Sequence, residues 1–366
     1  MKFQISRGEM LKGLQAVIGV VERRQTMPIL SNLLLKADKN GLMLAGTDLE
    51  LELVTRAPAT VKQEGSTTVP ARKLFDICRG LPEDAEIKCE LKEQRLTLSS
   101  SRSRFILSTL NADEFPFLEE IKDAKSVNVP KQALKQMLDR THFAMAHQDV
   151  RYYLNGLLLV VRKDRMRAVA TDGHRLALCD ATGSLPVTEE IQVIVPRKAI
   201  SELQRLLDAG EDAVKLSFSS NHLQINLGET RFTTKLIDGR FPDYEKVIPA
   251  TGDKHLTGQR EPIRQALSRT AILSNEKFRG VRLSLKDSKL KLQAQNPEHE
   301  EAEEELEVEY DGAPIEIGFN VTYLMDALGG LESESFTLDL TGPDASGLIR
   351  EKGSDACQYV VMPMRL

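Results

Sequence analysis

The chain has 366 residues, with 49 basic and 54 acidic side chains and a formal net charge of −5. Hydrophobic residues make up 41% and charged residues 28%, which is typical of a soluble globular protein. No apolar run approaches the roughly 20 residues that a membrane helix needs, and the first residues, MKFQISRGEM, lack the apolar core of a signal peptide. We therefore expect a cytoplasmic protein of two or three domains.

An amphipathic helix is predicted near the start of each third of the chain. The three segments span 8–21, 130–146 and 262–273, and each leads into a hairpin-like stretch.

A second helix repeats later in each third. The segments 69–81, 195–207 and 319–331 align without gaps, and their apolar residues fall in three columns at helical spacing. The chain therefore consists of six half-units, two in each third. The columns are Leu74, Ile200 and Leu324; Ile77, Leu203 and Ala327; and Leu81, Leu207 and Leu331.

Alternating apolar and polar residues follow at 87–110, 214–237 and 281–296. A period of two, broken by short polar turns, predicts antiparallel strands with one buried face. Each third is therefore expected to be an α+β module in which helices cover one face of its sheets.

Two polar segments, 111–128 and 242–262, have the composition of links between modules. They divide the chain into three repeated modules at 1–122, 123–250 and 251–366.

Basic residues are concentrated on the six expected helices. These carry 16 basic and eight acidic side chains, so the helices hold +8 and the remainder −13. The first two repeats share two basic columns, Arg72 with Lys198 and Arg79 with Arg205, away from the apolar side. This pattern indicates a surface for a polyanion, although Lys and Arg are also good helix formers with solvated heads.

The four cysteines, Cys78, Cys89, Cys179 and Cys357, lie far apart with no Cys-x-x-Cys pair. This spacing indicates neither a zinc site nor a redox pair. We expect mostly buried thiols, as in a reducing cytosol, and neither a cofactor nor a metal ion.

Seven longer motifs occur in order along the chain. They are VPARKLFDICRGLP (69–82), HQDVRYYLNG (147–156), ATDGHRLA (170–177), DGRFPDY (238–244), AILSNEKFRGVRL (271–283), IGFNVTYLMDAL (317–328) and YVVMPMRL (359–366). Together they resemble the bacterial DNA polymerase III beta subunit family, the DNA sliding clamps, from the first residue to the last. Long motifs in the right order are far more specific than one short pattern.

The resemblance implies a head-to-tail homodimeric ring of six modules, with antiparallel sheets outside and helices lining a hole around duplex DNA. Helices pack about 8–10 Å apart. Six in a circle leave a hole of about 9 Å and twelve leave about 28 Å, after one helix thickness is subtracted. A duplex about 20 Å across passes only the larger hole, so two chains are needed. The implied function is non-catalytic: the clamp tethers the replicative polymerase for processive DNA synthesis.

The resemblance also implies DNA-contacting residues, to which the basic columns add Arg72 and Arg79. The cations would meet phosphates without reading sequence, and the tyrosines could stack on an exposed base or simply pack at a strand edge. The set is Arg24, Arg72, Arg79, His147, Gln148, Tyr152, Tyr153, Arg197 and Lys198.

A pocket for short peptides is implied between the second and third modules, shared by the polymerase, the clamp loader, and repair and translesion polymerases. Its Met and Val walls would adapt to varied apolar side chains. Lys246 stands where the family pattern leads us to expect Arg, so the charge is kept but the planar guanidinium with its paired donors is lost. Asp344 stands where an apolar residue is expected, which could weaken an apolar contact to the peptide. The pocket residues are Thr171, Gly173, His174, Arg175, Leu176, Pro242, Val247, Tyr323, Val360, Met362, Pro363, Met364 and Arg365.

The two ends of the chain are complementary in charge, as a head-to-tail interface requires. The first module offers basic and apolar residues, and the third offers apolar residues and a run of glutamates. The first set is Lys73, Arg95, Arg102, Arg104, Phe105 and Leu107, and the second is Ile272, Leu273, Glu298, Glu300, Glu301, Glu303 and Glu304.

Three other interpretations remain. The acidic run NPEHEEAEEELEVE, with His299, has the ligand types of a hard-cation site or is a solvated loop. Asp48, Glu50 and Glu52 alternate along a strand as nuclease acids could, with no His or Lys beside them in the sequence. A peptide scaffold that does not touch DNA is the third. His174 suggests catalysis, but the chain has no matching hydrolase, Walker A or zinc-protease motif.

Overall fold

The computed structural model describes the chain over 1–22, 27–119, 121, 124–207, 213–250 and 252–365. Arg24 and the proposed module boundaries at 122, 123 and 251 lie outside these residues. Within them, no helix is both long enough and apolar enough to cross a membrane.

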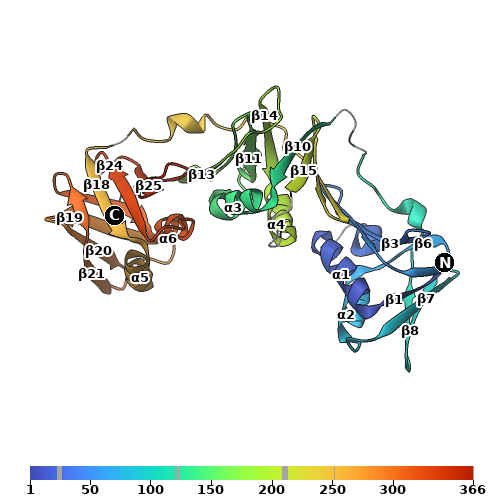
Figure 1. Cartoon of the computed structure of the whole chain (residues 1–366). Coiled ribbons are helices and arrows are strands. Elements are labelled where there is room, and N and C mark those ends of the chain that lie inside the picture. The colour runs from blue at the N-terminus through green and yellow to red at the C-terminus, as the bar shows by residue number, and fades with distance from the viewer. Residues whose placement is uncertain (23–26, 120, 122–123, 208–212, 251, 366) are drawn as a thin grey trace. The chain divides into compact units, whose positions relative to one another are not determined.

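The described residues form six α-helices at the positions that the two repeats predicted (Figure 1). Leu74, Ile200 and Leu324 are buried, whereas Ile77 and Leu81 are only partly buried. The first helix of each third is shorter than predicted because the chain continues into a 3-10 turn. The helices are α1 (Arg7–Val17), α2 (Ala71–Gly80), α3 (Lys131–Thr141), α4 (Arg197–Leu206), α5 (Arg260–Thr270) and α6 (Val321–Gly329).

Residues Met1–Lys131 and Ser201–Leu236 form one compact unit. It contains two antiparallel sheets, and α1 packs against both α2 and β4. The five-stranded sheet runs β5 (Thr60–Gln63), β1 (Lys2–Ser6), β7 (Glu86–Lys92), β8 (Arg95–Ser100) and β9 (Ser103–Ser108). The eight-stranded sheet runs β10 (Lys125–Pro130), β15 (Ala213–Phe218), β16 (His222–Leu227), β17 (Thr230–Lys235), β4 (Leu51–Ala57), β3 (Gly41–Thr47), β2 (Asn32–Asp38) and β6 (Gly65–Pro70).

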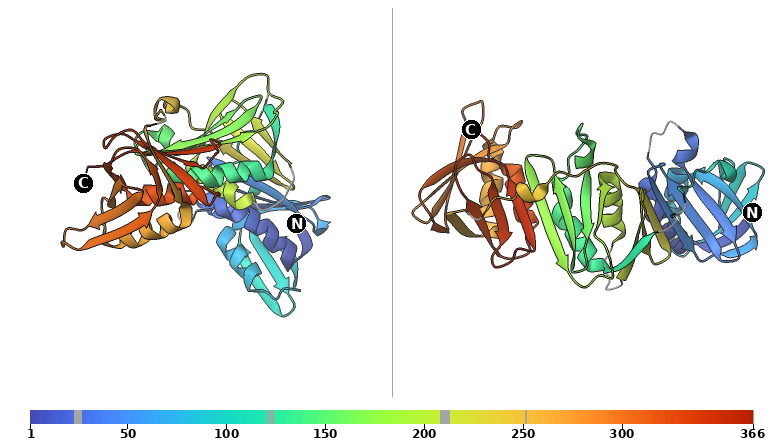
Figure 2. Two further views of the ribbon diagram at one scale, coloured as in Figure 1. Left: turned by 60° about the vertical axis from the view of Figure 1, so that its left-hand side comes forward. Right: turned by 90° about the horizontal axis from the view of Figure 1, so that it is seen from above.

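Residues Gln132–Ile200 and Ile237–Leu366 form the second compact unit. Its helices α5 and α6 pack on each other beside two further antiparallel sheets (Figure 2). The nine-stranded sheet runs β14 (Ile191–Pro196), β11 (Gly156–Val161), β12 (Arg165–Thr171), β13 (Arg175–Thr182), β26 (Cys357–Val361), β25 (Gly347–Glu351), β24 (Ser335–Leu340), β18 (Lys254–Gln259) and β22 (Glu309–Asp311). The four-stranded sheet runs β21 (Glu301–Glu307), β20 (Lys289–Gln295), β19 (Gly280–Lys286) and β23 (Ile315–Asn320).

One pairing rule builds both larger sheets. Here a series means three strands that are consecutive in the chain and paired in that order. The series β2–β4 ends with β4, which pairs with β17, the last strand of the series β15–β17. The series β11–β13 ends on β13, which pairs with β26, the end of the series β24–β26. The two remaining series end on β9 and β21, and both of these strands lie at the edges of their sheets. Each larger sheet therefore joins one third of the chain to the next, and two equivalent strands are left at edges.

The acidic run forms a solvated turn over 296–300 and then continues into strand β21, so its interpretation as a solvated loop is wrong for Glu301–Glu307. Glu301–Glu307 pair with β20 along their whole length. Lys289 binds Glu305 (2.7 Å) and Lys291 binds Glu303 (2.9 Å). These cross-strand pairs offset the repulsion between the glutamates.

The cysteines divide into two kinds. Cys78 and Cys89 are buried free thiols, as expected. Cys179 and Cys357 instead form a disulfide between facing positions of β13 and β26, so the expectation of a thiol is wrong for this pair. They are 178 residues apart in sequence, and spacing alone does not reveal such a pairing.

Candidate functional site

The basic columns of the repeated helices partly hold the helices together. Arg72 donates from Nη2 to the carbonyl of Val21 (3.0 Å), and Arg205 donates from Nη1 to the carbonyl of Gln15 (2.7 Å). The last carbonyls of a helix, including that of Gln15, have no partner within it. Arg79 is more available, because its side chain is 67% exposed and its ion pair lies on the surface. Of these columns, Arg79 is therefore the cation best placed to meet an external anion.

Arg197, at the start of α4, holds the loop that precedes β11. Its Nη1 donates to the carbonyl of Met145 (2.8 Å), and its backbone N–H donates to the carbonyl of Asn155 (3.0 Å). Lys198 follows on the same helix. The enclosed segment, 145–155, carries four of the predicted DNA-contacting residues, so α4 both offers cations and positions this loop.

Asp149 shapes the loop. Its backbone N–H donates to Oδ1 of Asn155, and Nδ2 of Asn155 donates back to the carbonyl of Asp149, both at 2.9 Å. Hydrogen bonds from the Arg151 side chain and backbone lower the pKa of Asp149 to about 2. Gln148 adopts a left-handed conformation, with φ +57°. The loop is thus a defined structure that exposes His147 and Gln148.

The two predicted tyrosines lie in different environments. Tyr152 is 58% exposed, whereas Tyr153 packs against a buried cluster that includes Phe241 and Tyr244. Their rings meet edge to face at 5.9 Å. Val150, which the sequence prediction missed, is 95% exposed. The loop therefore presents one aromatic and one aliphatic side chain to a ligand, while Tyr153 supports them.

The segment 171–175 makes a tight turn into β13. Oγ1 of Thr171 donates to the carbonyl of Arg175 (2.7 Å), and Oδ1 of Asp172 accepts the backbone N–H groups of His174 (2.9 Å) and Arg175 (3.0 Å). Gly173 has φ +88°, which a residue with a Cβ rarely adopts. The Asp–His pattern that suggested catalysis is therefore used to form a turn.

Arg175 connects this turn to α6. Its guanidinium contacts Oδ2 of Asp172 (3.1 Å) and Oδ2 of Asp326 (2.5 Å), and it donates to the carbonyl of Phe143 (2.6 Å). It also lies 4.4 Å from the centroid of the Tyr323 ring, and burial raises the pKa of that tyrosine. Arg175 therefore fixes the position of Tyr323.

The last residues of the chain are tied down beside the same turn. Met362 donates from its backbone N–H to the carbonyl of His174 (2.9 Å), and Met364 donates to the carbonyl of Gly318 (2.8 Å). Leu176 faces Val360 across β13 and β26. The structure thus gathers predicted pocket residues from distant parts of the sequence.

A buried apolar cluster supports these residues. It includes Leu176 and Val360, and Val247 packs against it. Phe241, Tyr244 and Leu348 are among the members that the predicted pocket set did not include, although the motif DGRFPDY signalled the first two. Lys246 and Asp344, the two departures from the family pattern, are exposed, and Lys246 pairs with Asp243 (2.7 Å).

Strand β9 presents a different side chain from the one predicted. Leu107 is buried in its own unit, whereas Ile106 is 48% exposed, next to exposed Arg104. Successive side chains of a strand point to opposite faces, so Leu107 is not the exposed apolar side chain that was expected, and Ile106 is exposed instead. Phe105 is partly buried. Lys73, Arg95 and Arg102 are exposed as predicted.

The corresponding end, around β21, exposes acids and one large apolar side chain. Ile272 is 76% exposed and Leu273 is partly buried. Glu304 binds Arg269 (2.6 Å), and this contact lowers the pKa of Glu304. Glu298, Glu300, Glu301 and Glu303 are exposed.

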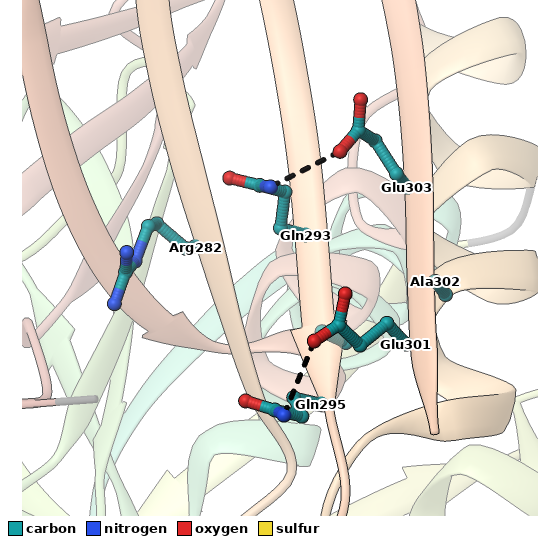
Figure 3. A pocket seen from close by; sticks show the side chains of 7 residues that line it. Arg282, Gln293, Gln295, Glu301, Ala302 and Glu303 are labelled. Carbon is teal, nitrogen blue, oxygen red and sulfur yellow. Dashed lines mark hydrogen bonds between the residues drawn. The ribbon is translucent and has the colours of Figure 1, made fainter. Parts of the chain in front are cut away.

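A shallow polar hollow lies on the four-stranded sheet beside this edge (Figure 3). Gln293 donates to Glu303 (3.1 Å) and Gln295 donates to Glu301 (3.2 Å). The amides hold these two carboxylates in place, and Lys291 also pairs with Glu303 (2.9 Å). Strand β21 carries five glutamates against the three paired cations Lys289, Lys291 and Arg269. The strand edge therefore stays acidic.

The acids proposed for a nuclease each have a structural partner. Asp48 accepts backbone N–H groups of its own turn, and Lys235 lies 3.2 Å from Glu50. Glu52 accepts the backbone N–H of Leu118 (2.9 Å). The predicted alternation along a strand is wrong, because only Glu52 lies on β4, whereas Asp48 and Glu50 precede it. No Lys is beside these acids in the sequence, but the fold brings Lys235 of β17 to Glu50. Across the described part of the chain, no three His, Cys, Asp or Glu side chains are grouped to hold a metal ion.

The repeated sheets and helices define a three-domain clamp architecture. Models of the N-terminal, central and C-terminal domains of the DNA polymerase III beta subunit match residues 1–119, 128–243 and 245–365. The chain belongs to this family, the DNA sliding clamps, as the motifs predicted.

Individual relatives agree over full length. The chain is 53% identical to a beta sliding clamp of Pseudomonas putida and 50% identical to that of Escherichia coli K12, with 100% of each chain covered. It matches the crystal structure of the DNA polymerase III subunit beta from Pseudomonas aeruginosa with a TM-score of 0.97 and 51% identity, again over 100% of both chains. A Caulobacter crescentus beta sliding clamp structure matches at 38% identity with a TM-score of 0.95, over 100% of this chain and 99% of that one. Family membership establishes a sliding clamp of DNA replication.

Proposed function

We propose that two copies of this chain close head to tail into a ring around duplex DNA and hold the replicative polymerase there. The observation that carries the proposal is the pairing rule of the sheets. The strands β4 and β13 each pair with the last strand of a series in another third. Strand β21 of one copy would pair in the same way with β9 of a second copy, which uses the two series-ending strands that are left at sheet edges.

Charge and apolar contact support this pairing. Strand β9 carries Arg104 and Ile106, and the opposite end offers Glu301, Glu303 and exposed Ile272. Opposite charges attract in the intended pairing, whereas two copies of either edge would repel each other. Three modules per chain, 1–122, 123–250 and 251–366, give the six modules and twelve helices that a hole wide enough for a duplex requires.

DNA contacts in this account are weak and independent of sequence. Arg79 and Lys198 lie on repeated helices, and Tyr152 projects from the loop that Arg197 holds. A closed ring stays on DNA because leaving requires an interface to open, so strong phosphate binding is not needed and would oppose sliding. The chain itself would perform no catalysis and would act in the cytoplasm.

Partner peptides would bind beside Tyr323, Leu176, Val360 and Met362. The polymerase, the clamp loader, and repair and translesion polymerases would share these residues. The terminal segment supports this assignment, because its backbone is hydrogen-bonded to the turn at His174 rather than frayed.

A primed circular single-stranded template tests the function. With the replicative polymerase and clamp loader of the same bacterium, adding the chain should extend products from short fragments to full-length circles in one binding event. Product length that does not change on adding the chain would contradict the proposal. Pocket variants that keep dimerisation but lose long products would assign the tethering step to the pocket.

A further inference from the structure

A pair of cysteines joins the two strands that connect the second third of the chain to the last. Cys179 on β13 faces Cys357 on β26, and their Cα atoms are 4.1 Å apart. Facing residues of antiparallel strands approach closely in the non-hydrogen-bonded positions. The two sulfur atoms therefore meet without any movement of the backbone. Both residues are buried, with exposures of 3% and 1%.

A guanidinium lies against one of the two sulfurs. Nη1 of Arg140, on α3, is 3.2 Å from Sγ of Cys357. The Arg140 side chain is 14% exposed and also forms ion pairs with Glu332 and Glu351. A cation beside a cysteine favours the thiolate, which is the reactive form. Cys357 is thus the better nucleophile of the pair, with Cys179 placed to attack it after oxidation.

The two other cysteines provide an internal contrast. Burial raises the pKa of Cys89 far above its usual range and that of Cys78 to about 12. They lie in the other compact unit and remain free thiols. Cys179 and Cys357 are similarly buried, so the difference between the pairs is the guanidinium 3.2 Å from Sγ of Cys357. Oxidation is therefore expected first at this pair.

We propose that Cys179 and Cys357 are a reversible oxidation site, with hydrogen peroxide as oxidant and a small thiol as reductant, that fastens β13 to β26. The Cys357 thiolate attacks one peroxide oxygen, giving a sulfenic acid and hydroxide. The Cys179 thiol then attacks the sulfenic sulfur, and the disulfide forms with loss of water. Two molecules of small thiol reverse the reaction through a mixed disulfide and leave as their own disulfide. Disulfides of this kind in reducing compartments are usually transient.

The link acts on the strand pair that also carries peptide-pocket residues. Leu176 faces Val360 three pairs along the same ladder. A covalent link between the strands restricts their separation, so backbone amides of β26 should exchange with solvent more slowly in the oxidised chain. The relation to peptide binding rests on the proposed function, whereas the chemistry of the cysteines does not.

Thiol counting tests the chemistry. The full-length folded protein is treated with dithiothreitol or with peroxide and is then unfolded for alkylation, because all four cysteines are buried. Dithiothreitol should expose four alkylatable cysteines, and hydrogen peroxide should return the count to two, with Cys78 and Cys89 still free. In Cys179→Ser, peroxide should leave a sulfenic acid on Cys357 that dimedone traps. The control Cys89→Ser should form the link at the wild-type rate. Four thiols remaining after peroxide, or trapping at Cys357 no faster than at Cys89, would overturn the proposal.

Two further measurements test the role of Arg140 and of the link. Arg140→Gln should slow oxidation several-fold, because it removes the cation that lies against Sγ of Cys357 and favours the thiolate, while Arg140→Lys should restore most of the rate. Hydrogen exchange at β26 should be slower in the oxidised wild type and insensitive to peroxide in Cys357→Ser. Equal exchange rates in both redox states would refute the proposal that the disulfide restricts the separation of β13 and β26. This result would not bear on whether the ring closes.

Discussion

Oε1 of Glu52 lies 3.4 Å from Nη2 of Arg231, which joins strand β4 of the first third to β17 of the second. The other oxygen of Glu52 accepts the backbone N–H of Leu118 (2.9 Å). One buried carboxylate therefore contacts a strand of each third and the segment that links them.

The free energy of unfolding should depend on pH through the protonation of the Glu52 carboxylate. Burial raises the pKa of Glu52 more than its hydrogen bonds lower it. The folded chain then binds the proton more tightly than the unfolded chain, so the contribution of Glu52 is present at low pH and is lost as pH rises through the raised pKa. The free energy of unfolding of wild type relative to Glu52→Gln should fall between pH 4 and neutral pH. Glu50→Gln, at an exposed neighbour, is the control, and a difference that grows with pH would contradict the assignment.

Replacing Arg175 by Lys should damage the peptide site while keeping the charge. Lysine cannot contact Asp172, Asp326 and the Phe143 carbonyl together or stack on Tyr323 with a planar group. We expect a loss of about 1–3 kcal/mol in the free energy of unfolding and weaker binding of a short peptide derived from the polymerase. Denaturant titration and fluorescence anisotropy measure the two effects. Arg264→Lys, at a half-exposed surface ion pair, should change neither.

Dimer formation should depend on Ile106 rather than Leu107 for surface contact. Ile106→Asp removes an apolar contact, worth about 1.5–3 kcal/mol when fully buried, and adds a charge. We expect the dimer dissociation constant to rise at least about 100-fold. Sedimentation equilibrium should then show the 40.8 kDa chain. The matching change Ile272→Asp should act alike, whereas Val150→Asp, at another exposed apolar residue, should leave a dimer.

The salt dependence of DNA binding should identify the phosphate contacts. Each cation that meets a phosphate contributes roughly one unit to the slope of log affinity against log salt. Arg79→Ala should lower the slope by about one, because Arg79 is exposed on α2. Lys62→Ala, on β5, should leave it unchanged. An equal effect of both variants would point to general charge rather than a defined surface.

Periodicity predicted the helices well because all three copies of the second repeat bury the same leading apolar position, occupied by Leu74, Ile200 and Leu324. The spacing of Leu74, Ile77 and Leu81, and of the equivalent residues in the other two copies, specified helices, and alternation specified the strands that follow them. The acidic strand β21 was not predicted, because its pairing depends on Lys289 and Lys291 of the neighbouring strand.

Site residues that lie in the longer motifs were predictable from the sequence. Residues whose exposure depends on which face of a strand they occupy were less predictable. Period two alone did not show that Ile106 rather than Leu107 faces outward, since that choice depends on which face of the sheet is covered. The partners of Arg72 and Arg205 are carbonyls from another segment, which no local pattern reveals. The facing of Cys179 and Cys357 likewise depends on the pairing of strands far apart in the sequence.

Retention on DNA before and after linearisation tests encirclement most directly. The chain is loaded onto a nicked circular plasmid with its clamp loader, free protein is removed, and the plasmid is cut once. A closed ring should remain on the circle and leave rapidly from the cut ends, and a block placed at both ends should restore retention. Equal persistence on circular and linear DNA would show binding by affinity and would contradict the ring.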